Sequence, residues 1–368
     1  MLLLTKAIPL WLFGAAHDYG AAKRRIADFR GSGKSMKDIR GKSAFVSRSW
    51  VCGCTALSLL LACSVPARAA EGALGFYLLG SKTTMGGYLP GPGIYGSLSN
   101  YGYFGSANID YENAGVIVSG DIKAKAYLPL PTMLWVINGK VAGGNLAFSV
   151  TTPIGYKTVS ADALLNKPRG APLALDYNRD NTAFGDPVFG ATLGWHSGKL
   201  HYSLATLVNV PVGQWQLGNP VSIGFHRLAV DETGALTYLD PKSGLELSGA
   251  AGITFNVKNH DTDYKTGTEV HFEWAAMKHL SHTASIGLHG YAYKQIGADS
   301  GSGALLGPFK GRVFAVGPAL DYTFKIGKTP VVTNLRYLHE FGVENRLKGD
   351  VGFLNFVVPI SVAAAQTH

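Results

Sequence analysis

Residues 312–326 read RVFAVGPALDYTFKI and alternate between two kinds of side chain. The odd positions from 315 onward are small or polar. The even positions are mostly large and apolar: Phe314, Val316, Pro318, Leu320, Tyr322, Phe324 and Ile326. Successive side chains of a β-strand point to opposite faces, so this period of two residues predicts a strand with one apolar face.

The same alternation recurs along most of the chain from about Tyr101 onward, with turn-forming residues between the segments. Residues 189–196, 269–280 and 284–296 are the clearest further examples. In the second of these, Val270, Phe272, Trp274 and Ala276 oppose Glu269, His271 and Glu273. The sequence therefore predicts an all-β protein built from many short strands.

Connection lengths distinguish a soluble β-sandwich from a barrel. Long links at 212–235, 258–268, 297–311 and 342–349 alternate with short ones at 197–199, 241–244, 281–283 and 327–329. Outer-membrane barrels alternate short periplasmic turns with longer external loops. We predict an antiparallel transmembrane β-barrel of about twelve strands, with ten and fourteen as alternatives and both termini in the periplasm.

The first 69 residues read as a leader. They contain 11 Lys and Arg against 3 Asp and Glu, so most of the +9 net charge lies there and gives no support to a nucleic-acid partner. Lys37, Arg40, Lys42 and Arg48 precede an apolar run at 51–62, and Ala67-Arg68-Ala69 fits a cleavage site. We predict a signal peptide cleaved near Ala69, preceded by an extension if Met36 is the true start.

All three cysteines, Cys52, Cys54 and Cys63, also lie in the leader. A disulfide framework, a thiolate metal site and a cysteine nucleophile are therefore excluded from the rest of the chain. A rival interpretation takes 60–63, LLAC, as a lipobox with Cys63 lipidated.

The predicted organisation has four parts: a leader at 1–69, an N-terminal segment at 70–98, the barrel at 99–361 and a C-terminal tail at 362–368. The N-terminal segment contains LPGPG at 89–93, which cannot pair as a regular strand. It is either a plug inside the lumen or a disordered periplasmic lead. Residues 128–131, LPLP, are predicted to form a turn, and Gly143-Gly144 to interrupt the third strand.

Eight polar side chains are predicted to point into the lumen. They are His271, Glu273, His289, Tyr291, Tyr293, Asp321, Arg336 and Glu340. They could line a solute path, hydrogen-bond across a wet lumen, or form a hydrolytic site. No G-x-S-x-G nucleophile elbow supports the last interpretation.

The loop at 259–264, NHDTDY, carries alternating acidic residues, as a Ca²⁺ loop does. It lacks the glycine and distal glutamate of an EF-hand, and a solvated turn is the simpler interpretation. The sequence thus predicts no metal site, no cofactor and no catalytic residue.

Residues 184–213, FGDPVFGATLGWHSGKLHYSLATLVNVPVG, resemble the SphA-like family of outer-membrane proteins, also labelled the phenol-degradation meta-pathway transporter family. Further similar runs follow in the family's order: NVKNHDTDYKTG at 256–267, GYAYKQIGADSGSG at 290–303, GPFKGRVFAVGPALDY at 307–322 and YLHEFGVENRLKG at 337–349. With LPGPGIY at 89–95, the resemblance covers nearly all of the chain after the leader.

This resemblance implies a porin-like channel in a Gram-negative outer membrane for passive uptake of small hydrophobic or aromatic compounds. The expected partners are outer-membrane lipid and lipopolysaccharide, the small hydrophobic solute and the barrel assembly machinery. The alternatives are a structural or adhesive barrel with a closed lumen and a barrel-embedded lipid hydrolase.

Overall fold

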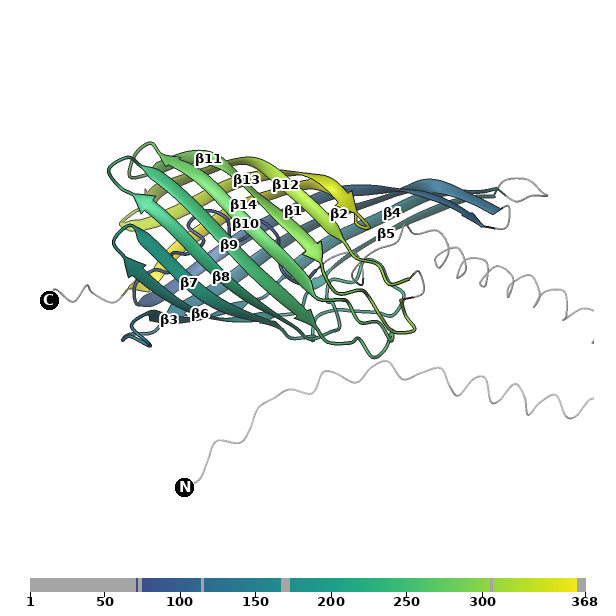
Figure 1. Cartoon of the computed structure of the whole chain (residues 1–368), viewed down its shortest axis with the longest axis horizontal. Coiled ribbons are helices and arrows are strands. Elements are labelled where there is room, and N and C mark those ends of the chain that lie inside the picture. Colours follow the sequence, from purple (N-terminus) through teal and green to yellow (C-terminus); the bar gives the residue numbers. More distant parts are fainter. Residues whose placement is uncertain (1–70, 72–74, 114–115, 167–172, 305–306, 363–368) are drawn as a thin grey trace, which may run out of the picture. The chain divides into compact units, whose positions relative to one another are not determined.

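The computed structural model describes residues 71, 75–113, 116–166, 173–304 and 307–362, and its secondary structure is almost entirely β (Figure 1). The strands within these residues are β1 (Gly93–Asn113), β2 (Val116–Val136), β3 (Asn145–Thr151), β4 (Ile154–Asn166), β5 (Leu173–Phe184), β6 (Val188–Ser197), β7 (Leu200–Asn209), β8 (Ala229–Asp240), β9 (Leu245–Asn256), β10 (Glu269–His279), β11 (Ala284–Gln295), β12 (Arg312–Ile326), β13 (Thr329–Glu344) and β14 (Lys348–Val362).

The strands close into one antiparallel barrel. Pairing runs without crossovers from β6 to β14, and β1 then pairs with both β14 and β2. Both β3 and β4 pair with β2, and they lie one after the other along a single strand of the barrel. The next strand of the barrel is likewise made of two segments, β6 paired with β3 and β5 paired with β4. The fourteen segments therefore make a closed barrel of twelve strands, as the sequence predicted.

Prolines explain why two barrel strands are interrupted. Thr152 and Pro153 separate β3 from β4, while Pro187 ends the gap between β5 and β6. The predicted turn at 128–131 is wrong, because these residues lie inside β2 and pair with β1. Pro131 faces the break in the neighbouring strand, where its carbonyl accepts a bond from Thr152 N at 3.1 Å. Its missing N–H therefore costs no ladder bond there.

Gly143 and Gly144 lie in the turn between β2 and β3, directly before β3 begins, so they do not interrupt a strand. The predicted long link at 342–349 is also wrong, because β13 continues to Glu344 and only 345–347 connect it to β14. Gly342 has a φ of 59° at this point. A glycine tolerates that conformation, and the strand passes through a bulge instead of ending.

The two faces of the barrel differ as predicted. Apolar side chains on the outer face are between 43% and 60% exposed: Phe189, Leu204, Leu236, Phe272, Leu288 and Leu320. Side chains of opposite parity, including His271, Ala315 and Ala319, are buried inside. An apolar outer wall around a closed hydrogen-bonded barrel is suited to lipid and not to water.

The longer loops gather at the end of the barrel opposite the C-terminal end of β14 (Figure 1). They comprise 210–228, 257–268 and 296–311, whereas connections such as 198–199 and 327–328 at the other end are short. We take the long-loop end as extracellular. The hairpins β1–β2 and β4–β5 extend beyond the other strands at this end, since β14 pairs with β1 only as far as Ser106.

The leader, its cleavage site and Cys63 lie outside the described residues, as do 363–368. β1 begins at Gly93 and β14 ends at Val362, so the strands reach slightly past the predicted barrel limits of 99 and 361. No helix among the described residues is long and apolar enough to cross a membrane.

A closed barrel satisfies its backbone hydrogen bonds internally, so we expect it to stay folded in cold detergent. Unheated and boiled samples of the purified protein are expected to migrate differently on a denaturing gel. Equal migration of both samples, or recovery as a soluble monomer without detergent, would contradict the membrane barrel.

Candidate solute-binding cavity

The structure brings the eight predicted lumen residues together on four neighbouring strands, β10 to β13. All eight point inward, and all except the half-buried Asp321 are buried. His271 lies directly opposite Tyr293, and Glu273 lies opposite Tyr291, across the β10–β11 ladder.

Glu273, His289 and Arg336 hold the N-terminal segment 75–92 inside the barrel. The Glu273 carboxylate accepts bonds from Gly80 N at 2.8 Å and Lys82 N at 2.6 Å. Arg336 donates to the carbonyl oxygens of Gly80 and Ser81 and to Thr84 Oγ1. These residues therefore hold the segment against the inner wall of the barrel.

Further wall contacts continue along the same segment. His289 Nδ1 lies 3.1 Å from Thr83 Oγ1, and Glu246 accepts a bond from Met85 N at 2.7 Å. Thr237 Oγ1 accepts from Gly87 N at 3.0 Å. The sequence analysis missed Glu246 and Thr237, although both lie at inward positions of alternating strands and could have been found by parity.

His271 belongs to a second buried group. Its Nε2 lies 3.0 Å from Asp231 Oδ2, and the ring of Tyr77 stacks on its imidazole with centroids 3.6 Å apart. Thr233 and Thr254 also donate to Asp231. With its carboxylate shared in this way, Asp231 fixes the position of the imidazole, and Tyr77 covers one face of the ring.

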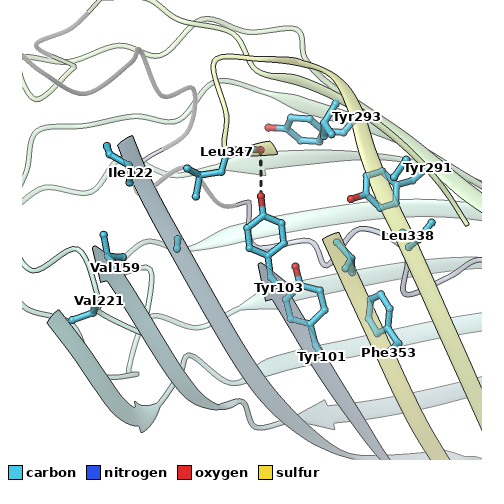
Figure 2. Packing of buried hydrophobic residues seen from close by; sticks show 14 residues of the cluster. Tyr101, Tyr103, Ile122, Val159, Val221, Tyr291, Tyr293, Leu338, Leu347 and Phe353 are labelled. Atoms are coloured by element: carbon cyan, nitrogen blue, oxygen red, sulfur yellow. Dashed lines mark hydrogen bonds between the residues drawn. The ribbon is translucent and has the colours of Figure 1, made fainter. Parts of the chain in front are cut away.

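A tyrosine-rich wall follows toward the extracellular end. Glu340 accepts hydrogen bonds from Tyr103 at 3.1 Å and Tyr291 at 2.8 Å, and Glu269 accepts one from Tyr293. Figure 2 shows Tyr101 and Tyr103 of β1 beside Phe353, with Tyr291 and Tyr293 across from them. The two carboxylates fix the phenol groups, and the aromatic rings form an apolar surface between them.

This wall borders a cavity of about 580 Å³ within the barrel. Aromatic and aliphatic side chains supply much of its lining: Phe76, Tyr77, Leu78, Tyr101, Tyr103, Leu128, Leu130, Trp215, Ile223, Phe225, Tyr291, Tyr293 and Phe353. Four of the predicted residues, His271, Tyr291, Tyr293 and Glu340, also border it. The other four, Glu273, His289, Asp321 and Arg336, do not.

The loop 210–228 forms the extracellular side of the cavity, and Asp186 holds it in place. The Asp186 carboxylate accepts bonds from Gly213 N and Phe225 N at 2.7 Å each, and from Asn209 Nδ2 at 3.1 Å. Asp186 lies in the break between β5 and β6, where the backbone leaves room for this contact. The residue is part of the FGDPVFG run quoted above, but its sequence context gives no sign of a loop-anchoring role.

Arg227, at the end of the same loop, is buried, and its Nε donates to Asn256 Oδ1 at 3.2 Å. Its Nη1 lies 3.5 Å from Glu71 Oε2. Seven residues bordering the cavity each keep one buried polar atom without a hydrogen-bond partner among the described residues: Glu71 Oε2, Tyr77 OH, Asn209 Oδ1, Arg227 Nη2, His271 Nδ1, Arg346 Nη1 and Asn355 Oδ1. Such a concentration indicates a site that takes up water or a ligand with polar groups.

The acidic loop at 259–264 does not form a cation site in the described part of the chain. Asp261 pairs with His226 at 2.8 Å. Asp263 pairs with Lys258 and accepts two bonds from Ser302, and these contacts hold the pKa of the Asp263 carboxyl well below its usual range. The carboxylates serve to tie neighbouring loops together.

Residues 106–356 match the model of the family described as the MetA-pathway of phenol degradation. The chain belongs to this family. The resemblance inferred from the motifs is thereby confirmed, and the match covers most of the barrel wall, Asp186 and the loop 210–228.

The solved structures similar to the chain include two from Pseudomonas species. The COG4313 outer membrane channel from Pseudomonas putida F1 has a TM-score of 0.55 and 14% identity, over 77% of this chain and 99% of that one. A Pseudomonas aeruginosa FadL homologue has a TM-score of 0.38 and 10% identity, over 80% and 98%. No curated protein sequence matches this chain. The first likeness shows that the family member described here has the fold of an outer-membrane barrel.

Proposed function

We propose that this family member is an outer-membrane channel for passive uptake of small hydrophobic or aromatic compounds. The observation that carries the proposal is the cavity of about 580 Å³, which has apolar and aromatic walls and a few fixed polar groups. Pockets of this size and composition bind small organic molecules. The similarity in fold to the COG4313 outer membrane channel supports this interpretation.

The eight predicted residues divide into groups with different proposed roles. His271, Tyr291, Tyr293 and Glu340 border the cavity and contact the solute path. Glu273, His289 and Arg336 instead hold the segment 75–92. Asp321 bonds Ser285 and Asn334 and stabilises the wall nearer the periplasm.

A solute leaving the cavity toward the periplasm meets the segment 75–92. Passage therefore requires this segment to shift. The bonds to Glu273 and Arg336 oppose that movement, because each buried polar group released must find another partner or stay unsatisfied.

Transport through a barrel needs no covalent chemistry, so we propose that the protein is not an enzyme. The proposed location is the Gram-negative outer membrane, reached after cleavage near Ala69. The proposed partners are outer-membrane lipid, lipopolysaccharide and the barrel assembly machinery.

Filling the cavity is expected to block uptake. Ala126 borders the cavity on β2, so Ala126→Trp places an indole in the solute space. We expect the entry of small aromatic solutes into proteoliposomes to fall several-fold. The matched control is Ala276→Trp, which faces lipid on β10 and is expected to leave entry unchanged.

Equal entry through the wild type and Ala126→Trp would contradict the proposed path. A wild-type protein that admits no solute would favour the closed structural or adhesive barrel, which the bonded lumen segment also fits. Release of fatty acid from lipid esters by the purified protein would favour the hydrolase.

A further inference from the structure

Four exposed lysines lie near the extracellular limit of the apolar outer wall. They are Lys123 and Lys125 on β2, Lys294 on β11 and Lys348 on β14. Their positions alternate with buried neighbours such as Ala124, Tyr293 and Gly349, so their side chains face outward. None of the four forms an ion pair with a residue in the described ranges.

Strand register brings these cations to one side of the barrel. Lys348 lies opposite Ser106, and Ser106 lies opposite Lys123 on the next strand. Lys294 lies opposite Arg312, which pairs with Glu344. The four lysines and Arg312 form what we call the cationic rim, which spans β11 to β2 through β12, β13, β14 and β1.

The outer surface of the barrel is apolar on the membrane side of the cationic rim and polar on the extracellular side. Phe104 is paired with Lys125 and is 60% exposed, and Tyr127 and Phe341 are also exposed on the lipid-facing wall. Arg312 lies over the ring of Phe314 at 5.7 Å. A ligand lying along this wall therefore meets apolar rings toward the membrane centre and positive charge at its edge.

Beyond the cationic rim, the extended hairpins present a polar outer face. Asp121 of β2 lies opposite Asp162 of β4, and Lys123 lies opposite Ser160. On β5, Asn178 continues the same row beside Ser160. Carboxylate, hydroxyl and amide groups of this kind hydrogen-bond sugar hydroxyls.

We propose that the cationic rim binds the phosphate groups of a phosphorylated glycolipid of the outer leaflet. Its acyl chains would lie on the aromatic wall, its phosphates against the lysines, and its sugars along the outer face of the extended hairpins. Lysine recognises phosphate as a compact positive charge with three donors. The proposal rests on the outer-membrane location in the proposed function, with the long-loop end of the barrel extracellular, but it concerns the outer surface and not the solute path.

The test uses bisphosphorylated lipid A added to the purified protein in neutral detergent. The variant Lys123→Gln, Lys125→Gln, Lys294→Gln, Lys348→Gln removes four charges and keeps a polar side chain of nearly the same length. The matched control is Lys140→Gln, Lys242→Gln, Lys325→Gln, Lys328→Gln, since these exposed lysines lie at the opposite end. Binding is read from a saturable rise in the unfolding temperature and from tryptophan fluorescence.

We expect the wild type and the control to bind lipid A alike, and the rim variant to bind about tenfold more weakly or worse. Dephosphorylated lipid A is expected to bind the wild type about as weakly as lipid A binds the rim variant. Added salt is expected to weaken the phosphate-dependent part of the binding. Unchanged binding by the rim variant would overturn the proposal. Binding of phosphatidylglycerol as tightly as lipid A would also overturn it, because that result indicates a general preference for anionic lipid. Competition by inorganic phosphate at a concentration similar to that of lipid A would overturn it as well.

Solute entry into proteoliposomes separates this result from the proposed function. The rim variant is expected to admit aromatic solutes at the wild-type rate, because the four lysines do not border the cavity. A barrel that binds lipid A through the rim but admits no solute would refute only the channel.

Discussion

Leu320→Arg is expected to lower the free energy of unfolding by roughly 2–4 kcal/mol in lipid vesicles, because it places a charge near the hydrocarbon midplane. Leu320 lies near the middle of β12 and is 43% exposed on the outer wall. A denaturant titration of the vesicle-bound protein, followed by tryptophan fluorescence, measures the change.

The matched control is Ile326→Arg, on the same face of the same strand but at its periplasmic end, where the side chain is 67% exposed. A charge there reaches the interface, so we expect a loss of only about 0–1 kcal/mol. Equal losses at both positions would mean that the outer wall does not face a bilayer. The inward sites Ala319 and His271 are unsuitable controls, because both are buried against other side chains.

Glu273→Ala is expected to free the segment 75–92. The change leaves Gly80 N and Lys82 N without their acceptor and removes a carboxylate from the surroundings of Arg336. Losing both bonds to a charged group costs about 3 kcal/mol or more. We therefore expect hydrogen exchange at the Gly80 and Lys82 amides to become roughly a hundredfold faster, and the single-channel conductance to rise.

Glu232→Ala is the control for this experiment, since Glu232 is exposed on the outer face of β8 and accepts bonds from Thr206. It is expected to leave both measurements unchanged. If Glu273→Ala increases exchange without increasing conductance, the segment is released but does not block the path. If exchange is also unchanged, Glu273 is not an anchor. Retained gel mobility of the unheated sample would show that the barrel itself is intact.

The alternation in 312–326 and its counterparts determined the class of fold and the direction of the side chains. Period-two segments such as 269–280 have only one economical conformation, because a strand is the element that turns every second side chain to the same face. The lumen positions of His271, Glu273, Tyr291 and Glu340 followed from that parity. The prediction of about twelve strands followed from the alternation of long and short connections.

Predictions of turns and loops from the local sequence were wrong where the effect of a residue depends on the neighbouring strand. Leu128 to Pro131 reads as a turn, but Pro131 sits beside the break at Pro153 and loses no ladder bond. The link at 342–349 reads as a loop, but Gly342 lets β13 bulge and continue. In both cases, the conformation depends on a neighbouring strand that is distant along the chain, so no local sequence pattern reveals it.

Only the tertiary structure decided what the inward residues contact. Glu273 and Arg336 have the parity of path-lining residues, yet they bind a segment that precedes them by about 190 and 250 positions. The anchoring role of Asp186 likewise depends on a loop that folds back over its strand break. Parity along one strand fixes the direction of a side chain, whereas the occupant of the lumen depends on closure of the barrel around a separate part of the chain.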